Sequence, residues 1–73
     1  MTNKLHPLTR IRSRVAMSQR ELAKRSGVSQ KTLSNIETGF RLPDPVTVGK
    51  IAQALGLEFD EVYDAIFADR EAS

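Results

Sequence analysis

Four polar residues of three chemical kinds lie close together in the middle of this 73-residue chain: Gln30, Lys31, Ser34 and Asn35. An amide presents a donor beside an acceptor and can pair with N6 and N7 of adenine, whereas a lysine ammonium suits O6 and N7 of guanine. A helix face that is only solvated is normally filled with Glu and Lys. The set therefore favours recognition of base edges, and the competing interpretation is four ordinary exposed polar residues.

A short helix and a tight turn are predicted just before these residues. Ser18 and Glu21 have the spacing of a capping box, so a helix is expected to begin there. Leu22 and Ala23 start its apolar face. Gly27 supplies the positive φ that ends a helix at low cost, and the sequence Ser-Gly-Val-Ser at residues 26–29 forms the turn.

The polar set itself is predicted to lie on a second helix, from Gln30 to Thr38. Ser29 is its N-cap, because its hydroxyl can accept a free backbone N–H of the first turn. Leu33 and Ile36 point inward, which leaves the polar residues on the outer faces. Gly39 is expected to close this helix as a left-handed C-cap.

Three further helices are predicted. The first starts at Pro7, where a missing N–H costs nothing, and ends near Ala16. Another begins at the Asp44-Pro45 pair and stops at Gly56, and the last runs from about Glu58 to Ala68. No strand pattern or repeat appears, so we expect an all-α, compact five-helix domain. Its boundaries are predicted as 1–7, a flexible N-terminal arm; 8–68, the domain; and 69–73, a C-terminal tail.

The apolar residues of the first four predicted helices are expected to form one core. Its predicted members are Leu8, Ile11, Val15, Leu22, Ala23, Val28, Leu33, Ile36, Val48, Ile51, Ala52 and Leu55. The last helix has more large apolar residues than one small core needs, so Tyr63, Ile66 or Phe67 could contact a second subunit, with plain core packing as the alternative. Phe40, in the loop after the polar helix, is another candidate dimer contact.

Charge is divided unequally along the chain. Residues 1–42 hold nine Lys or Arg against two acids, and residues 43–73 hold two against seven, giving +7 and −5. Such a dipolar chain would turn its basic half toward a polyanion. Cysteine is absent and His6 is the only histidine, so the sequence supports neither a metal, nor a cofactor, nor an enzyme. Without a long apolar run or a secretory signal, we expect a soluble cytoplasmic protein.

From Leu8 to Phe67 the chain resembles the phage repressor and Cro type (XRE-like) of helix-turn-helix DNA-binding domain. The resemblance is carried by Ser18-Gln19, Glu21-Leu22-Ala23, Gly27-Val28-Ser29, Leu33, Ile36, Glu37, Gly39, Pro43, Lys50-Ile51-Ala52 and Ala54-Leu55-Gly56. It implies a lambda-repressor-like fold in which helix 30–38 lies in the major groove.

The resemblance and the side-chain chemistry together assign roles to individual residues. Base contacts are expected from Gln30, Lys31, Asn35 and Ser34. Phosphate contacts are expected from Gln19, Ser29, Thr32, Thr38 and Arg41. In relatives the residue at Gln19 also braces the one at Gln30, and the residues at Arg12 and Glu37 form an internal ion pair.

The predicted function is a sequence-specific transcriptional regulator, a repressor that binds a palindromic operator in double-stranded DNA as a homodimer. One recognition helix buries too little surface to select a site in a genome, so two copies are expected to act together. The alternative is an antitoxin or accessory module that uses the same fold to bind another protein, a hypothesis that the apolar surplus of the last helix favours.

Overall fold

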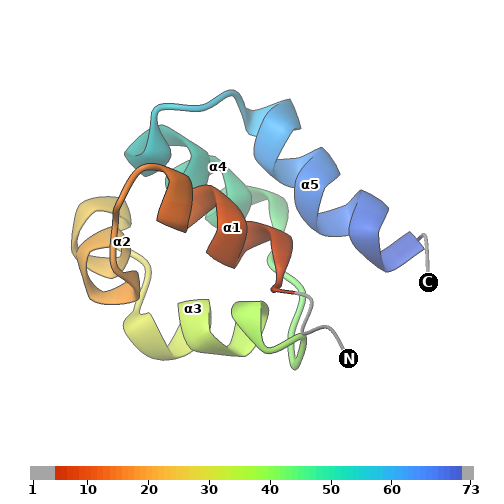
Figure 1. The fold of residues 1–73 in the computed structure, drawn as a ribbon, viewed down its shortest axis with the longest axis horizontal. Coiled ribbons are helices and arrows are strands. Elements are labelled where there is room, and N and C mark those ends of the chain that lie inside the picture. The colour runs from red at the N-terminus through yellow and green to blue at the C-terminus, as the bar shows by residue number, and fades with distance from the viewer. Residues whose placement is uncertain (1–4, 72–73) are drawn as a thin grey trace.

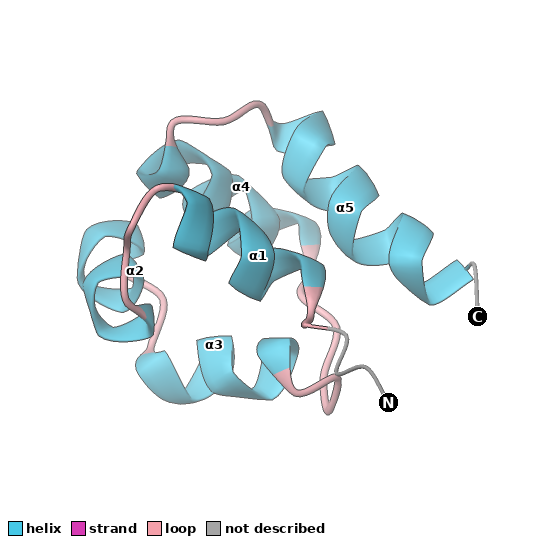
Figure 2. Cartoon of the chain, in the orientation of Figure 1, coloured by secondary structure: helices cyan, strands magenta, loops and turns pink. Residues whose placement is uncertain are grey.

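The described part of the chain folds into five helices. The computed structural model describes residues 5–71, with side chains as far as residue 68. The helices are α1 (Pro7–Arg14), α2 (Gln19–Ser26), α3 (Gln30–Glu37), α4 (Pro45–Leu55) and α5 (Phe59–Glu71). Within the described part no residue is in a strand, which confirms the predicted all-α class (Figure 2).

The five helices pack around one another in a way that leaves α3 at an edge. Helix α2 contacts α3 and α4, α1 contacts α3 and α5, and α4 contacts α5. In Figure 1, α3 lies along one side of the molecule, with α1 and α2 on its inner side. This position leaves the outer face of α3 exposed or partly exposed to solvent, while its inner face rests on the core.

Three of the predicted helix starts are confirmed by their capping side chains. Ser18, Ser29 and Asp44 cap α2, α3 and α4, each by accepting the backbone N–H three residues further on, at 3.0, 3.1 and 2.8 Å. Gly27 and Gly56 end α2 and α4 in the left-handed region, at φ 77° and 73°. These local signals were readable in the sequence because each involves only residues a few positions apart.

The core contains members of every helix and of the α2–α3 turn. Buried apolar residues are Leu8, Ile11, Leu22, Val28, Leu33, Ile36, Val48, Ile51, Ala52, Leu55, Val62 and Ile66. Ala23 is only partly buried against them. Helix α5 therefore completes the core of this same domain through Val62 and Ile66, which are 0% and 2% exposed.

Val15 is a correction to the predicted core, because its side chain is 45% exposed. Helix α1 ends at Arg14, earlier than the predicted end near Ala16, and Val15 is its C-cap. Ala16 then takes a left-handed φ of 54°, which turns the chain away toward α2. Val15 consequently does not continue the buried face of α1 that Leu8 and Ile11 form.

Helix α1 begins and helix α5 ends close to the predicted limits of the domain. Pro7, the last residue of the predicted arm and the predicted start of the first helix, is buried as the first residue of α1. Most of that arm, residues 1–4, lies outside the described residues. Helix α5 continues to Glu71, so residues 69–71 of the predicted tail are helical. None of the helices in the described part has the length and apolar character needed to cross a bilayer.

Candidate nucleic-acid interface

The outer face of α3 carries the four polar residues singled out in the sequence. Gln30 and Lys31 are exposed, and Ser34 and Asn35 are partly exposed. On the opposite side of the helix Leu33 and Ile36 are buried. Within the described residues the side chains of Lys31, Ser34 and Asn35 make no hydrogen bond or ion pair. These three side chains are therefore available for an external partner.

The C-terminus of α3 ends in a Schellman motif. The N–H groups of Gly39 and Phe40 donate to the carbonyls of Ile36 and Asn35, at 3.0 and 2.9 Å. Gly39 adopts the left-handed φ of 81° that this motif needs. The helix itself ends at Glu37 and Thr38 is its C-cap, one residue earlier than predicted. The turn leaves Phe40 82% exposed beside the polar face.

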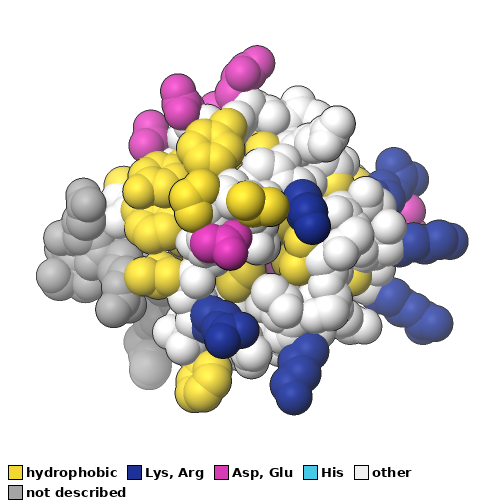
Figure 3. Space-filling view, turned by 180° about the vertical axis from the view of Figure 1, so that it is seen from behind, with side chains coloured by type: hydrophobic (Ala, Val, Ile, Leu, Met, Phe, Trp, Pro, Cys, Tyr) yellow, Lys and Arg dark blue, Asp and Glu magenta, His cyan; other side chains and the backbone are white. Residues whose placement is uncertain are grey.

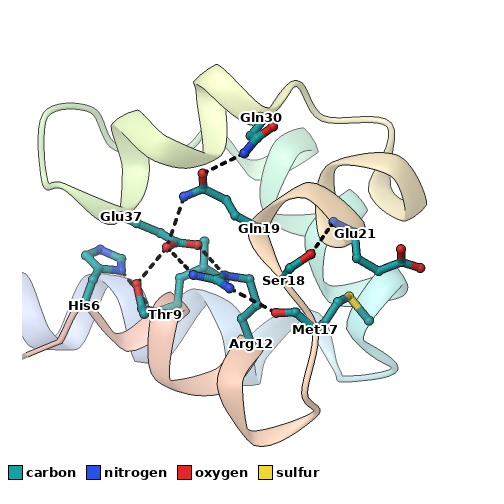
Figure 4. A network of polar contacts seen from close by, with 10 residues as sticks. His6, Thr9, Arg12, Met17, Ser18, Gln19, Glu21, Gln30 and Glu37 are labelled. Atoms are coloured by element: carbon teal, nitrogen blue, oxygen red, sulfur yellow. Dashed lines mark hydrogen bonds and ion pairs between the residues drawn. The ribbon is translucent and has the colours of Figure 1, made fainter.

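The carboxylate of Glu37 is the centre of a polar network beneath α3 (Figure 4). Arg12 donates to it twice, through Nε and Nη2, each at 2.9 Å. Thr9 Oγ1 donates at 2.8 Å and Gln19 Nε2 at 3.3 Å. Arg12 also donates from Nη1 to the carbonyl of Met17, at 3.0 Å. The network thus ties α3 to α1 and to the start of α2.

This ion pair is shielded from water. The side chains of Arg12 and Glu37 are 15% and 7% exposed. The other ion pair among the described residues, between Arg25 and Glu21 on α2, is 59% and 42% exposed. A bidentate pair held away from water loses less to solvent screening than an exposed pair, so the two pairs should differ in their effect on stability.

The network also decides the charge state of Glu37. Burial raises the pKa of the Glu37 carboxyl, but the hydrogen bonds from Arg12, Thr9 and Gln19 and the positive charge of Arg12 together lower it below the ordinary value. For Arg12, the hydrogen bond with Glu37 raises the pKa of the guanidinium. Both groups are consequently charged at neutral pH.

Acid should destabilise the domain through Glu37. A carboxyl whose pKa is lowered by folding adds stability above its unfolded pKa and loses it as the pH falls through the folded pKa. We expect the free energy of unfolding of the wild-type chain to fall as the pH drops below about 4.5, the ordinary Glu value.

Urea titrations between pH 7 and 3 would measure this, with Glu37→Gln as the comparison. Glu21 and Asp44, whose pKa values are also lowered by hydrogen bonds, are present in both chains, so the difference between the two curves isolates Glu37. Parallel curves would show that Glu37 contributes no acid dependence.

Gln19 connects the buried network to the exposed face. It lies at the first position of α2 and is half-buried. Its Nε2 faces Glu37, and its Oε1 accepts a hydrogen bond from Gln30 Nε2 at 3.4 Å. The side chain of Gln30 is thereby oriented at the start of α3, and Gln30 as a residue remains exposed (Figure 4).

The other residues predicted to contact phosphate lie near the two ends of α3 and in the loop after it. They differ in whether their side chains are already hydrogen-bonded within the protein. The Ser29 hydroxyl donates to Thr32 Oγ1 at 2.8 Å, so the Thr32 hydroxyl keeps its own proton for a further acceptor. The Thr38 hydroxyl donates to the Asn35 carbonyl at 3.2 Å and would have to exchange that bond. Arg41 is exposed in the loop that follows α3.

Thr9 is a member of the network that was not predicted from the sequence. It lies one turn before Arg12 on α1, so both side chains reach the same carboxylate. Its three-residue spacing from Arg12 was the available signal. That signal has meaning only once the partner, 28 residues away in the sequence, is known.

The candidate dimer residues divide into buried and exposed ones. Ile66 is 2% exposed inside the domain's own core, which removes it as a surface contact. Tyr63 is 37% exposed, Phe67 partly buried, and their rings stack with centroids 4.3 Å apart. Phe59 extends this column on the other side of Tyr63, at 5.7 Å. We call Phe59, Tyr63 and Phe67 the aromatic column of α5.

The unequal division of charge along the sequence is also a division in space. Figure 3 shows apolar side chains gathered on the α5 side of one face, with acidic side chains at their border. Most Lys and Arg side chains in this view lie toward the opposite side, where α2 is found. A polyanion approaching α2 and α3 would therefore meet a mainly basic and neutral surface.

Two short helices joined by a tight turn, with the second exposing amides and a cation along its length, define a helix-turn-helix DNA-binding domain. A sequence profile described as helix-turn-helix matches residues 9–62. An uncharacterized HTH-type transcriptional regulator of Sinorhizobium fredii (strain NBRC 101917 / NGR234), y4dJ, is 42% identical over 53 residues, which cover 73% of this chain and 69% of that protein.

Two uncharacterized HTH-type transcriptional regulators of Mycobacterium tuberculosis, from strains CDC 1551 / Oshkosh and ATCC 25618 / H37Rv, are 43% identical over 47 residues. This match covers 64% of this chain but only 34% of each mycobacterial protein. No solved structure shows a significant match. The chain belongs to the XRE-type helix-turn-helix family of DNA-binding transcriptional regulators.

Proposed function

We propose that this protein is a transcriptional repressor that binds a palindromic operator as a homodimer, with α3 of each copy in the major groove. The observation that carries the proposal is the position of Gln30. This residue is exposed at the N-terminal end of α3, and a hydrogen bond to Gln19 orients its side chain. A recognition helix that enters a groove by its N-terminal end places such a residue against base edges. Repression follows from occupancy, because a bound protein blocks polymerase without further machinery.

In this proposal different residues on and around α3 contact different groups of the DNA. Gln30 and Asn35 would pair with adenine and Lys31 with guanine, while Ser34 would touch a base edge, contact a phosphate or allow close approach. Gln19, Thr32 and Arg41 would contact phosphates on either side of the groove, with Ser29 and Thr38 near them.

The aromatic column of α5 is the surface that we propose joins the two copies. Tyr63 and Phe59 are 37% and 39% exposed although large apolar groups are normally buried when a domain stands alone. Two recognition helices about 34 Å apart would then match successive major grooves on one side of the duplex. Phe40 is the competing contact, since it is the most exposed large apolar residue described.

Selection of bound duplexes from a random pool tests the operator. An inverted repeat with half-sites about one helical turn apart is expected, and binding to it should weaken steeply as salt rises. If the selected duplexes share no repeat, or if affinity is the same for all sequences, the dimeric repressor is refuted.

A substitution of Gln30 tests the readout itself. Gln30→Ala should lower the preference for the selected base at one position of each half-site by about fivefold to 150-fold, since a bidentate pair is worth about 1–3 kcal/mol of discrimination. The salt dependence should stay unchanged, because no phosphate contact is lost. Competition binding with single-base variants of the operator measures both, and unchanged preferences would show that Gln30 reads no base.

The second candidate function is an antitoxin or accessory module. The same aromatic column favours it if the column binds a different protein and not a second copy of this chain. This candidate predicts weak DNA binding that is indifferent to sequence. The duplex selection therefore separates the two functions.

A further inference from the structure

The hydrogen bonds between Glu37, Gln19 and Gln30 have a direction. Gln19 Nε2 donates to Glu37 Oε1 at 3.3 Å, and Gln30 Nε2 donates to Gln19 Oε1 at 3.4 Å. The series starts at a carboxylate that is almost entirely shielded from solvent and ends at an exposed side chain on the proposed recognition face.

The carboxylate imposes this direction. An ionised carboxylate only accepts hydrogen bonds, so the atom of Gln19 that faces it must be the NH₂ group. Arg12 and Thr9 donate to the same carboxylate and help to keep it ionised. The amide of Gln19 therefore turns its oxygen toward Gln30. Because this oxygen only accepts, Gln30 must donate to it from its own NH₂ group.

The direction decides what Gln30 offers to a base. With one N–H donated to Gln19, Gln30 retains its second N–H and its oxygen, an adjacent donor and acceptor that fit N7 and N6 of adenine. In the reversed series the oxygen of Gln30 would accept from Gln19 and both N–H groups would be free. Two donors fit O6 and N7 of guanine instead.

We propose that Glu37 is a positioning residue for base recognition, which selects adenine over guanine at the base pair read by Gln30 by orienting both glutamine amides. This inference rests on the proposed role of Gln30, and it adds a residue that touches no DNA. The ion pair with Arg12 thus has a second consequence beyond stability, since it holds in place the acceptor from which the series starts.

The orientation itself can be tested in the 73-residue chain without DNA. Glu37→Gln keeps an oxygen for Arg12 but also presents an NH₂ group, so the series is free to reverse. We expect the side-chain amide resonances of Gln19 and Gln30 to shift in this variant in a ¹⁵N–¹H spectrum. Glu21→Gln is the control, because it makes the same substitution in the exposed ion pair with Arg25, on the same helix as Gln19. It should leave the amide resonances of Gln19 and Gln30 unchanged. Unchanged Gln19 and Gln30 signals in Glu37→Gln would overturn the proposal.

The consequence for recognition is measured as a ratio of affinities. Operators with adenine or guanine at the position read by Gln30 are compared, and Glu37→Gln should reduce the adenine preference at least about fivefold. A merely structural role would weaken binding to both operators equally and leave the ratio unchanged, which overturns the proposal. Gln19→Met, which breaks the series with Glu37 and Arg12 intact, should lower the same ratio and replaces Glu37→Gln if that variant does not fold.

The two proposals fail in different ways. If Gln30→Ala leaves the wild-type ratio unchanged, Gln30 reads no base and the proposed readout fails, while the spectra still decide the orientation of the amides. If Gln30→Ala abolishes the adenine preference but Glu37→Gln and Gln19→Met retain it, the readout stands and the role of Glu37 is refuted.

Discussion

Glu37→Ala is expected to lower the free energy of unfolding by about 3–5 kcal/mol, which is a large share of the stability of a small domain. The variant removes the acceptor of four hydrogen bonds and leaves the guanidinium of Arg12, only 15% exposed, without its partner charge. A buried charge left unpaired costs more than the pair itself contributes. Urea unfolding followed by circular dichroism measures the difference.

Two variants provide the controls for this experiment. Glu21→Ala breaks the exposed ion pair with Arg25 and should change stability far less, because solvent already screens that pair. Gln30→Ala removes an exposed side chain and should also melt close to the wild type. If Gln30→Ala lowers the melting temperature more than Glu37→Ala does, the ion pair is not the structural link that joins α1 to α3.

The second large effect is expected from Tyr63→Gln, which should lower affinity for the full palindromic operator by about a hundredfold or more. Two linked half-site contacts reinforce each other through a high effective concentration, and this advantage disappears when the copies separate. Tyr63 is the middle ring of the aromatic column, so its loss removes both stacking contacts. The substitution is neutral, so the field of the protein toward DNA stays the same.

Phe40→Gln is the matched control, because it makes the same neutral change at the competing surface. Sedimentation equilibrium should show monomers for Tyr63→Gln and dimers for Phe40→Gln, and affinity for an isolated half-site should be unchanged in Tyr63→Gln. Monomers for Phe40→Gln alone would place the dimer contact in the loop after α3. Two dimeric variants with normal operator affinity would rule out both surfaces.

The helices and their ends were predictable because they depend on neighbouring residues. Ser18, Ser29 and Asp44 cap the helices that they were expected to cap, and glycines end α2 and α4 as predicted. Each capping side chain bonds a backbone N–H only three residues further on, so both partners can be recognised from a short stretch of sequence. The buried and exposed faces of α3 followed for the same reason, from the regular spacing of Leu33 and Ile36.

The burial of individual apolar residues was less predictable. Periodicity placed Val15 in the core and gave Ile66 a choice between the core and a second subunit, whereas the structure exposes Val15 and buries Ile66. The left-handed turn at Ala16 decides the first case, and the packing of α5 against α1 and α4 decides the second. Neither the early helix end nor the neighbour of α5 is encoded in a local pattern.

The candidate site shows the same division. The residue types on α3 and the basic character of residues 1–42 belong to the sequence, and they indicated a DNA-binding surface before any contact was known. The convergence of Thr9, Arg12 and Gln19 on Glu37, and the orientation that Gln19 passes to Gln30, exist only after folding. Side-chain chemistry is a property of single residues, but a hydrogen bond acquires its direction from partners that the fold brings together across many positions of the chain.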